Sequence, residues 1–119
     1  MKGIGVDIVE FDRIRMVKNQ AKFVDKILHE KEKAIYHGFN NEKRQLEYLS
    51  GRFAAKEALY KAASTLCEGY NFNDFAILND EAGAPYVVTP VATKVEVDQN
   101  INISISHSEN YAVAFVVIG

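Results

Sequence analysis

The segment GRFAAKEALYKA, residues 51–62, constrains the fold of this chain more than any other stretch. It is rich in alanine and contains no proline, which favours a helix, and the helical pattern runs from residue 42 to residue 67. At about 100° per residue, its apolar side chains form two stripes on different sides of the helix. Because a helix that is apolar on two sides is buried, we predict a long central helix over 42–67. The stripes contain Leu46, Phe53 and Tyr60 on one side and Tyr48, Ala55, Leu59 and Leu66 on the other.

An acid and a base lie one turn apart in this helix. Glu57 and Lys61 point roughly the same way, and Glu57 borders the first apolar stripe. One interpretation is a solvated surface ion pair, worth about 0.2–0.5 kcal/mol. The residues at the two ends of the chain favour a functional role instead.

The segment GIGVDIVE, residues 3–10, predicts a strand over 2–9. Isoleucine and valine occupy one face, and Gly3, Gly5 and Asp7 occupy the other, where two glycines leave room for a helix or a ligand to approach the backbone. An Asp within a strand is disfavoured and is costly to bury unpaired. It can instead cap the next helix, but Asp12 is the more natural cap, which leaves Asp7 without a structural role.

The C-terminal residues predict a hairpin. Residues 101–107 alternate isoleucine with polar residues, 108–110 form a turn, and 111–118 are almost continuously apolar, as expected of a central strand. His107 ends the first strand. It is either a hydrogen-bonded boundary residue or, with the neighbouring serines, part of an anion site, although serines also simply form turns.

Composition is that of a globular protein, and we predict one domain over 1–119. No stretch is long and apolar enough to cross a membrane, and no signal peptide is recognisable, so we expect a cytoplasmic protein. Cys67 is the only cysteine, which excludes an intramolecular disulfide; we expect a buried thiol in a reducing compartment. No Cys/His cluster suggests zinc.

Charge is distributed unevenly along the chain. Residues 1–66 contain 13 Lys and Arg against 9 Asp and Glu, whereas residues 67–119 contain 1 against 7. This asymmetry predicts an anionic partner for the N-terminal half. Nucleic acid is disfavoured because the basic residues lack interleaved aromatic side chains for stacking. The basic residues fall into two groups, Arg13, Arg15, Lys18, Lys22 and Lys26 early in the chain and Lys43, Arg44, Arg52, Lys56 and Lys61 along the long helix.

Helices early in the chain and strands late, after one N-terminal strand, predict an α+β fold with a small antiparallel sheet packed on the long helix. The segment 90–98 fits either a helix or a strand, and a short helix after Pro90 is favoured. The remaining predicted elements are helices within 11–18, 20–28 and 30–37, strands near 75–79 and from 85 to 88, and a turn at 80–84 between those strands.

The three motifs GIGVDIVE, GRFAAKEALYKA and ISISHS, in this order and in so short a chain, resemble the holo-acyl-carrier-protein synthases, the short bacterial branch of the 4′-phosphopantetheinyl transferases. The resemblance extends nearly end to end. It implies transfer of the phosphopantetheine arm of coenzyme A to a serine of apo-acyl carrier protein, in fatty acid biosynthesis, with release of adenosine 3′,5′-bisphosphate.

The resemblance also implies roles for individual residues. Asp7 and Glu57 would hold Mg²⁺ at the pyrophosphate, and Lys61 would neutralise charge there. Lys43, Arg44 and Arg52 would bind the coenzyme phosphates, although Lys43 and Arg44 taken alone are ordinary exposed charges at a helix start. His107 would contact a phosphate. The proton acceptor for the serine stays open between the metal site and His107.

Carrier proteins are acidic, so the resemblance implies a basic docking surface that includes Arg13, Arg15 and Lys22. For the neighbouring Lys18 and Lys26, a simply solvated helix face is the alternative. The resemblance further implies a homotrimer with active sites between subunits. Two other classes of function stay open, a coenzyme A or nucleotide binding module without chemistry and a Mg²⁺-dependent phosphohydrolase with water as acceptor.

Overall fold

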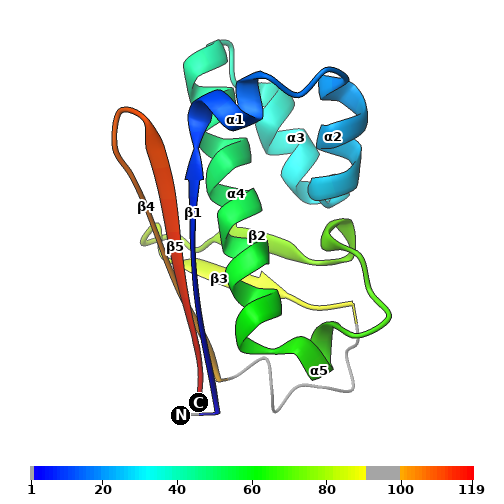
Figure 1. The fold of residues 1–119 in the computed structure, drawn as a ribbon, viewed down its shortest axis with the longest axis vertical. Coiled ribbons are helices and arrows are strands. Elements are labelled where there is room, and N and C mark those ends of the chain that lie inside the picture. The colour runs from blue at the N-terminus through cyan, green and yellow to red at the C-terminus, as the bar shows by residue number, and fades with distance from the viewer. Residues whose placement is uncertain (1, 91–99) are drawn as a thin grey trace.

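The computed structural model describes residues 2–90 and 100–119, and its α+β architecture confirms the predicted fold class (Figure 1). The predicted helix after Pro90 lies outside the described residues. The helices are α1 (Phe11–Arg15), α2 (Gln20–Ile27), α3 (Glu30–Gly38), α4 (Glu42–Ala62) and α5 (Ser64–Cys67), with a 3-10 helix η1 (Phe72–Asp74). The strands are β1 (Gly3–Glu10), β2 (Ala76–Asn79), β3 (Pro85–Val88), β4 (Ile101–His107) and β5 (Tyr111–Ile118).

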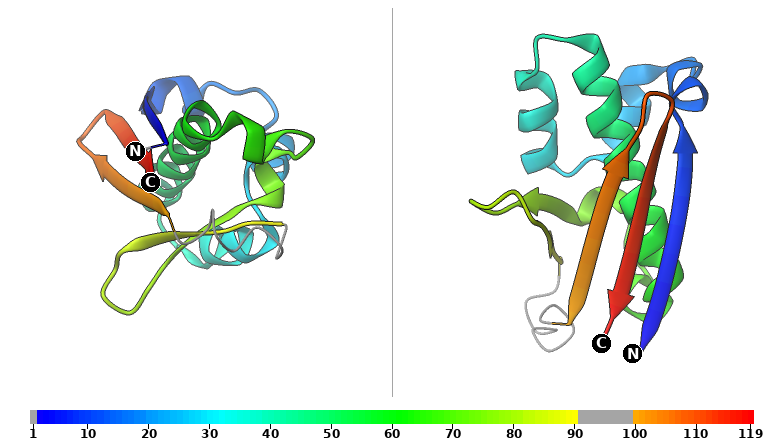
Figure 2. Two further views of the ribbon diagram at one scale, coloured as in Figure 1. Left: turned by 90° about the horizontal axis from the view of Figure 1, so that it is seen from below. Right: turned by 90° about the vertical axis from the view of Figure 1, so that its left-hand side faces the viewer.

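The larger sheet is three-stranded and antiparallel, in the order β1–β5–β4. The C-terminal hairpin is confirmed, and its second strand is central, as the apolar run predicts. One face of the sheet packs on α4, while no element formed by residues 2–90 or 100–119 covers the other (Figure 2). The uncovered face is apolar along β1 and β5, where cross-strand partners such as Val6 and Phe115 lie side by side, and polar along β4, which places Ser104 opposite Phe115. The exposed large apolar side chains on it are Ile4, Val6, Ile8, Tyr111 and Phe115, at 50%, 52%, 61%, 42% and 42%.

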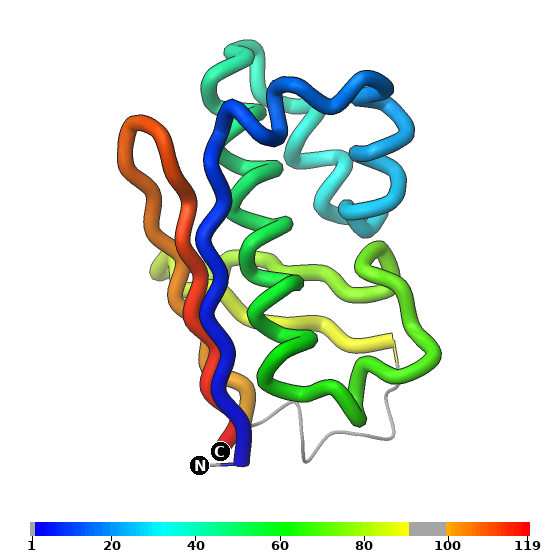
Figure 3. Tube along the Cα trace, viewed as in Figure 1, coloured from blue at the N-terminus to red at the C-terminus, as the bar shows by residue number. Residues whose placement is uncertain are grey.

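Strand β1 runs antiparallel to α4 and lies directly against it (Figure 3). A Cβ atom on Gly3 would collide with the carbonyl oxygen of Ala62, and one on Gly5 would collide with that of Ala58. The close approach predicted from the two glycines is therefore confirmed. Helix α4 is central and buried as predicted, and between Leu49 and Leu59 only Glu57 is partly exposed.

One predicted helix boundary and one predicted helix cap are wrong. The long helix ends at Ala62 rather than at residue 67, because Ala63 leaves the helical conformation at φ −139° and the short α5 follows it. Asp12 does not cap α1. The strand runs straight into a helix that begins at Phe11, whose backbone N–H donates to the Asn110 carbonyl, and Asp12 pairs with Arg15 instead. Cys67 is buried as predicted.

The two-stranded antiparallel sheet of β2 and β3 contacts α3 through β2 and β4 through β3. Lys56 is one of the basic residues grouped along the long helix, and the structure shows that it is fully buried. Its ammonium group is satisfied by Glu32 and by the carbonyls of Ile27 and Phe75, so this charge is available to no partner in solution.

No helix among residues 2–90 and 100–119 is both long enough and apolar enough to cross a membrane.

Candidate active site

The first group of predicted site residues, Asp7, Glu57 and Lys61, lies where β1 meets α4; we call it the carboxylate cluster. Lys61 Nζ lies 3.1 Å from Asp7 Oδ1 and 3.0 Å from the carbonyl oxygen of Val6. Asp7 is mostly buried, at 17% exposure, whereas Lys61 is half exposed. Lys61 therefore pairs across elements with Asp7 and not along the helix with Glu57. Asp7, predicted to have no structural role, has this cation as its partner.

Glu57 is half-buried on α4 next to Ala58, the residue whose carbonyl faces Gly5. Asp7 follows Gly5 by two residues on β1. The carboxylates of Asp7 and Glu57 therefore come from two elements that face each other, at neighbouring positions along them. Oxygen ligands suit Mg²⁺, which takes one or two carboxylates and fills its other positions with phosphates and water. Within the described ranges, no group of three or more His, Cys, Asp or Glu could enclose a metal. This donor set therefore fits Mg²⁺ bound together with a phosphate ligand.

The second group surrounds a pocket of about 160 Å³ between α4 and β4, the arginine pocket. It brings together three of the residues predicted to contact phosphate, Arg44, Arg52 and His107. Lys43 is exposed at the start of α4 and does not line it. The other lining residues are Phe39, Glu47, Tyr48, Gly51 and Ile105.

Arg52 is held firmly in this pocket. Its Nε donates to the Ile77 carbonyl at 3.0 Å and its Nη2 to Asn79 Oδ1 at 2.5 Å. The guanidinium lies 4.4 Å from the centre of the Tyr48 ring, a cation–π contact. Burial raises the pKa of the Tyr48 hydroxyl, and the Arg52 charge partly opposes that shift. Arg52 is thus a fixed cation whose orientation β2 determines.

Two further side chains give the pocket its charge. The Arg44 guanidinium lies 4.8 Å from the centre of the Phe39 ring. His107 Nδ1 lies 3.6 Å from Glu47 Oε2, a contact that becomes an ion pair when the imidazole is protonated. Two guanidinium groups, a histidine and two aromatic rings in one small pocket are a suitable set for a nucleotide phosphate.

The carboxylate cluster and the arginine pocket lie on different flanks of α4. Glu57 and Arg52 are five residues apart, which turns their side chains about 140° from each other around the helix. The cluster uses β1 and the pocket uses β4, and these strands are the two edges of the sheet, with β5 between them. One copy of the chain therefore holds two half-sites that do not face each other.

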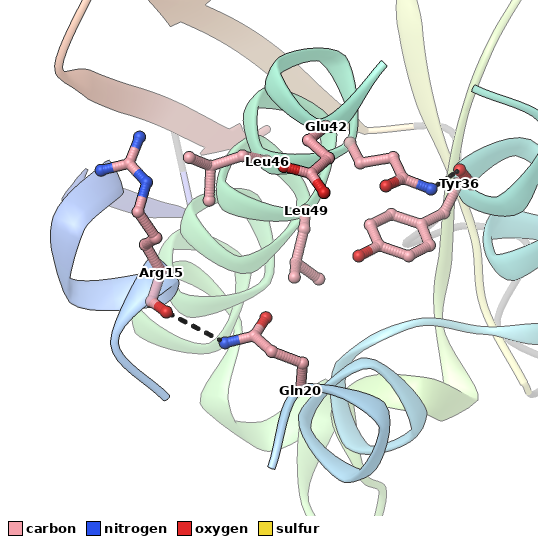
Figure 4. A pocket seen from close by; sticks show the side chains of 7 residues that line it. Arg15, Gln20, Tyr36, Glu42, Leu46 and Leu49 are labelled. Atoms are coloured by element: carbon pink, nitrogen blue, oxygen red, sulfur yellow. Dashed lines mark hydrogen bonds between the residues drawn. The ribbon is translucent and has the colours of Figure 1, made fainter. Parts of the chain in front are cut away.

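The predicted docking residues lie on α1 and α2. The Arg13 guanidinium lies 5.6 Å from the ring centre of Phe53, one turn before Glu57 on α4. Lys22 is exposed. Arg15 pairs with Asp12 and also lines a different pocket of about 300 Å³ among α1, α2, α3 and α4, in which Leu46 and Leu49 contribute apolar walls (Figure 4). None of the other predicted site residues lines that pocket.

Sequence reasoning missed Phe39, Glu47 and Tyr48 as lining residues of the arginine pocket. A signal existed for Tyr48, because residues 44, 48 and 52 follow one another at helical spacing on one side of α4. The contact between Glu47 and His107 joins residues far apart in the chain and has no local signature.

The family model of the 4′-phosphopantetheinyl transferase superfamily matches residues 3–116. The chain belongs to this superfamily. A holo-acyl-carrier-protein synthase of Acholeplasma laidlawii is 47% identical over 97% of this chain and 93% of its own length. One from Geobacillus is 48% identical over 98% of this chain and 94% of its own.

Solved structures agree with these relatives. The holo-acyl-carrier-protein synthase of Bacillus anthracis, in complex with CoA (3′,5′-ADP), is 37% identical, with a TM-score of 0.77 over 98% of this chain and 95% of that one. The Neisseria meningitidis synthase is 29% identical, with a TM-score of 0.82 over 100% of this chain and 98% of that one. This chain is an enzyme of the holo-acyl-carrier-protein synthase group.

Proposed function

We propose that the enzyme transfers the 4′-phosphopantetheine arm of coenzyme A to a serine hydroxyl of an apo-acyl carrier protein, with Mg²⁺, for fatty acid biosynthesis in the cytoplasm. The observation that carries the proposal is the carboxylate cluster, in which Asp7 and Glu57 come from facing elements and Lys61 Nζ lies 3.1 Å from Asp7 Oδ1. The Bacillus anthracis relative, crystallised with CoA (3′,5′-ADP), supports coenzyme A as the donor.

In the proposed reaction the serine oxygen forms a bond to the phosphorus that carries the pantetheine arm. The bond from that phosphorus to the bridging oxygen breaks, adenosine 3′,5′-bisphosphate leaves and the serine loses its proton. Asp7 and Glu57 would hold Mg²⁺, which when bound neutralises negative charge on the pyrophosphate. Lys61 adds a positive charge at the same place, and its half-exposed ammonium is free to move from Asp7 towards the leaving group.

The arginine pocket would bind the phosphates of the coenzyme through Arg44, Arg52 and His107. Arg52 is oriented before any ligand arrives, since Ile77, Asn79 and Tyr48 fix its guanidinium. Such preorganisation lowers the entropy lost on binding. Lys43, at the exposed start of α4, would approach a phosphate only from outside the pocket.

Catalysis then requires a second copy of the chain, because the two half-sites lie on different flanks of α4. The uncovered apolar face of the sheet, with Val6 and Phe115, is a suitable surface for assembly. We propose a homotrimer in which the carboxylate cluster of one subunit meets the arginine pocket of its neighbour. Arg13, Arg15 and Lys22, on α1 and α2, would dock the acidic carrier protein near the cluster.

Intact mass spectrometry of an apo-acyl carrier protein, incubated with coenzyme A, Mg²⁺ and enzyme, tests this function. Wild type should add one phosphopantetheine arm, and Asp7→Ala and Glu57→Ala should do so at least about a hundredfold more slowly, as expected for loss of a metal ligand. Asp25→Ala, which removes an exposed carboxylate on α2, is the matched control. Unmodified carrier with tightly bound coenzyme A would favour a binding module, and breakdown of coenzyme A without carrier would favour a phosphohydrolase.

A further inference from the structure

A buried ion pair lies behind the arginine pocket. Glu32 of α3 and Lys56 of α4 are both fully buried, and each is saturated with hydrogen bonds. Lys56 Nζ donates to Glu32, to the Ile27 carbonyl at 2.7 Å and to the Phe75 carbonyl at 2.8 Å. Glu32 also accepts from the backbone N–H groups of His29 and Ile77, both at 2.8 Å. The mechanism proposed above uses neither residue.

Ile77 connects this pair to Arg52. Its N–H donates to Glu32 Oε2, and its carbonyl oxygen accepts from Arg52 Nε at 3.0 Å. Two residues further along β2, Asn79 accepts from the same guanidinium. The buried carboxylate and the phosphate-binding arginine therefore both bind Ile77, along the edge of β2 that faces away from β3.

The strand needs such an anchor. β2 contains four residues and pairs only with β3, and a two-stranded hairpin is marginally stable by itself. The ion pair fixes β2 at two points, because Lys56 holds Phe75 and Glu32 holds Ile77. A shift of β2 would move both acceptors of Arg52 together.

We propose that Glu32 and Lys56 are positioning residues, which hold β2 so that Ile77 and Asn79 orient Arg52 towards the phosphates of coenzyme A. The proposal rests on the proposed function for the role of Arg52. It goes beyond that function, because it assigns to two residues remote from substrate a specific effect on coenzyme binding.

A double-mutant cycle between Glu32→Gln and Arg52→Ala tests the coupling. Glu32→Gln replaces one carboxylate oxygen by an NH2 group, which cannot accept a hydrogen bond. This NH2 group faces another donor, either the Lys56 ammonium or a backbone N–H, so one of the interactions that hold β2 is lost. We expect the Kd and KM for coenzyme A to rise about tenfold, as for other residues that orient a ligand-binding group, while the KM for carrier protein and kcat change less than twofold. In an Arg52→Ala background Glu32→Gln should have no further effect on coenzyme A.

Asp25→Asn is the matched control, because it makes the same change in an ion pair, Asp25–Lys33 at 2.9 Å, that does not reach β2. It should leave every constant unchanged. A second variant, Glu32→Leu/Lys56→Met, replaces the pair by apolar side chains and should stay folded by circular dichroism. We expect it to weaken coenzyme A binding as Glu32→Gln does.

Additive effects of Glu32→Gln and Arg52→Ala would overturn the proposal, as would equal losses in kcat and both KM values, or wild-type affinity in the apolar double variant. Calorimetry with coenzyme A alone measures the affinity. The double-mutant cycle therefore gives a coupling even if no carrier protein is modified. A wild-type enzyme that binds coenzyme A but transfers nothing would contradict the proposed function, while the coupling between Glu32 and Arg52 would still be decided.

Discussion

The ammonium group of Lys61 lies 3.1 Å from the carboxylate of Asp7, so the cation of the long helix covers the acid of the first strand. A divalent ion that binds to Asp7 must share the carboxylate with Lys61 or displace it. Like charges that compete for one carboxylate weaken each other's binding. The pair therefore couples metal affinity to the position of Lys61.

Replacing Lys61 by Met should separate metal binding from catalysis. With the competing ammonium removed, Mg²⁺ should half-saturate the enzyme at a concentration about threefold to tenfold lower, as expected for loss of a nearby like charge at an effective dielectric constant of about 20. The transfer rate should fall, because a charge at the pyrophosphate is lost. Mg²⁺ titrations of the transfer rate measure both effects, and Lys31→Met, on the exposed side of α3, is the control. If Lys61→Met needed a higher Mg²⁺ concentration than wild type for half-saturation, this account would be contradicted.

Substitution of Gly5 by Ala should destabilise the enzyme strongly. The added methyl group would collide with the Ala58 carbonyl, and neither the strand nor the buried helix can retreat without losing core contacts. We expect urea denaturation to show a loss of at least about 2 kcal/mol. Gly38→Ala is the matched control, because nothing lies within 4 Å of its Cβ position, and it should gain about 0.4–1 kcal/mol. Equal stabilities of the two variants would contradict the close approach.

A charge on the uncovered face of the sheet should abolish assembly. Phe115→Glu would place a carboxylate among Val6 and its neighbours, and burying it between subunits is unfavourable. Light scattering after size exclusion should show a monomer, and the monomer should transfer phosphopantetheine at least about a hundredfold more slowly, since it lacks a complete site. Tyr86→Glu is the control, because Tyr86 is 44% exposed against 42% for Phe115 but lies on β3. A trimeric Phe115→Glu enzyme would place the interface elsewhere.

Tyr60 should make stability fall in alkaline solution. Burial, with smaller contributions from Cys67 and Asp74, raises the pKa of its hydroxyl from 10.0 to about 12. Below pH 10 the folded and unfolded chains both keep this proton, so the contribution of Tyr60 to stability is fully present. As the pH rises further the unfolded chain ionises first, and the contribution is lost by about pH 12.

Urea midpoints of wild type and Tyr60→Phe, measured from pH 8 to 11, test this expectation. The variant loses the hydrogen bond to the Tyr70 carbonyl, at 2.6 Å, and should be about 1 kcal/mol less stable near neutral pH. Its stability should then decline less steeply with pH, so the two curves converge. Parallel curves would assign the alkaline transition to other groups.

The parts of the fold that were predictable depend on local chemistry. Gly3 and Gly5 indicated a close approach because only a residue without Cβ permits backbone contact, whatever the partner. The alternation of Ile101, Ile103 and Ile105 indicated a strand with one buried face, and the structure packs that face on α4.

The parts that were not predictable depend on distant partners. In the sequence, Lys56 has no nearby feature that indicates burial. Its burial requires Glu32, 24 residues earlier, together with two backbone carbonyls that only the tertiary fold supplies. The helical angle between Glu57 and Arg52 was available from the sequence. The sequence did not show which edge strand each side chain contacts, because that depends on the strand order. The separation into half-sites therefore needed the structure.

The strand order also determines when this chain is able to fold. β5 is the central strand, hydrogen-bonded to β1 on one side and β4 on the other, so β1 has no partner in the sheet until residues 111–118 have been synthesised. Until then β1 and the long helix α4 lack the sheet contacts that β5 provides in the folded protein. Pairing between elements so far apart in the chain also slows folding. Among the described strands, β5 is the one whose synthesis allows the three-stranded sheet to form.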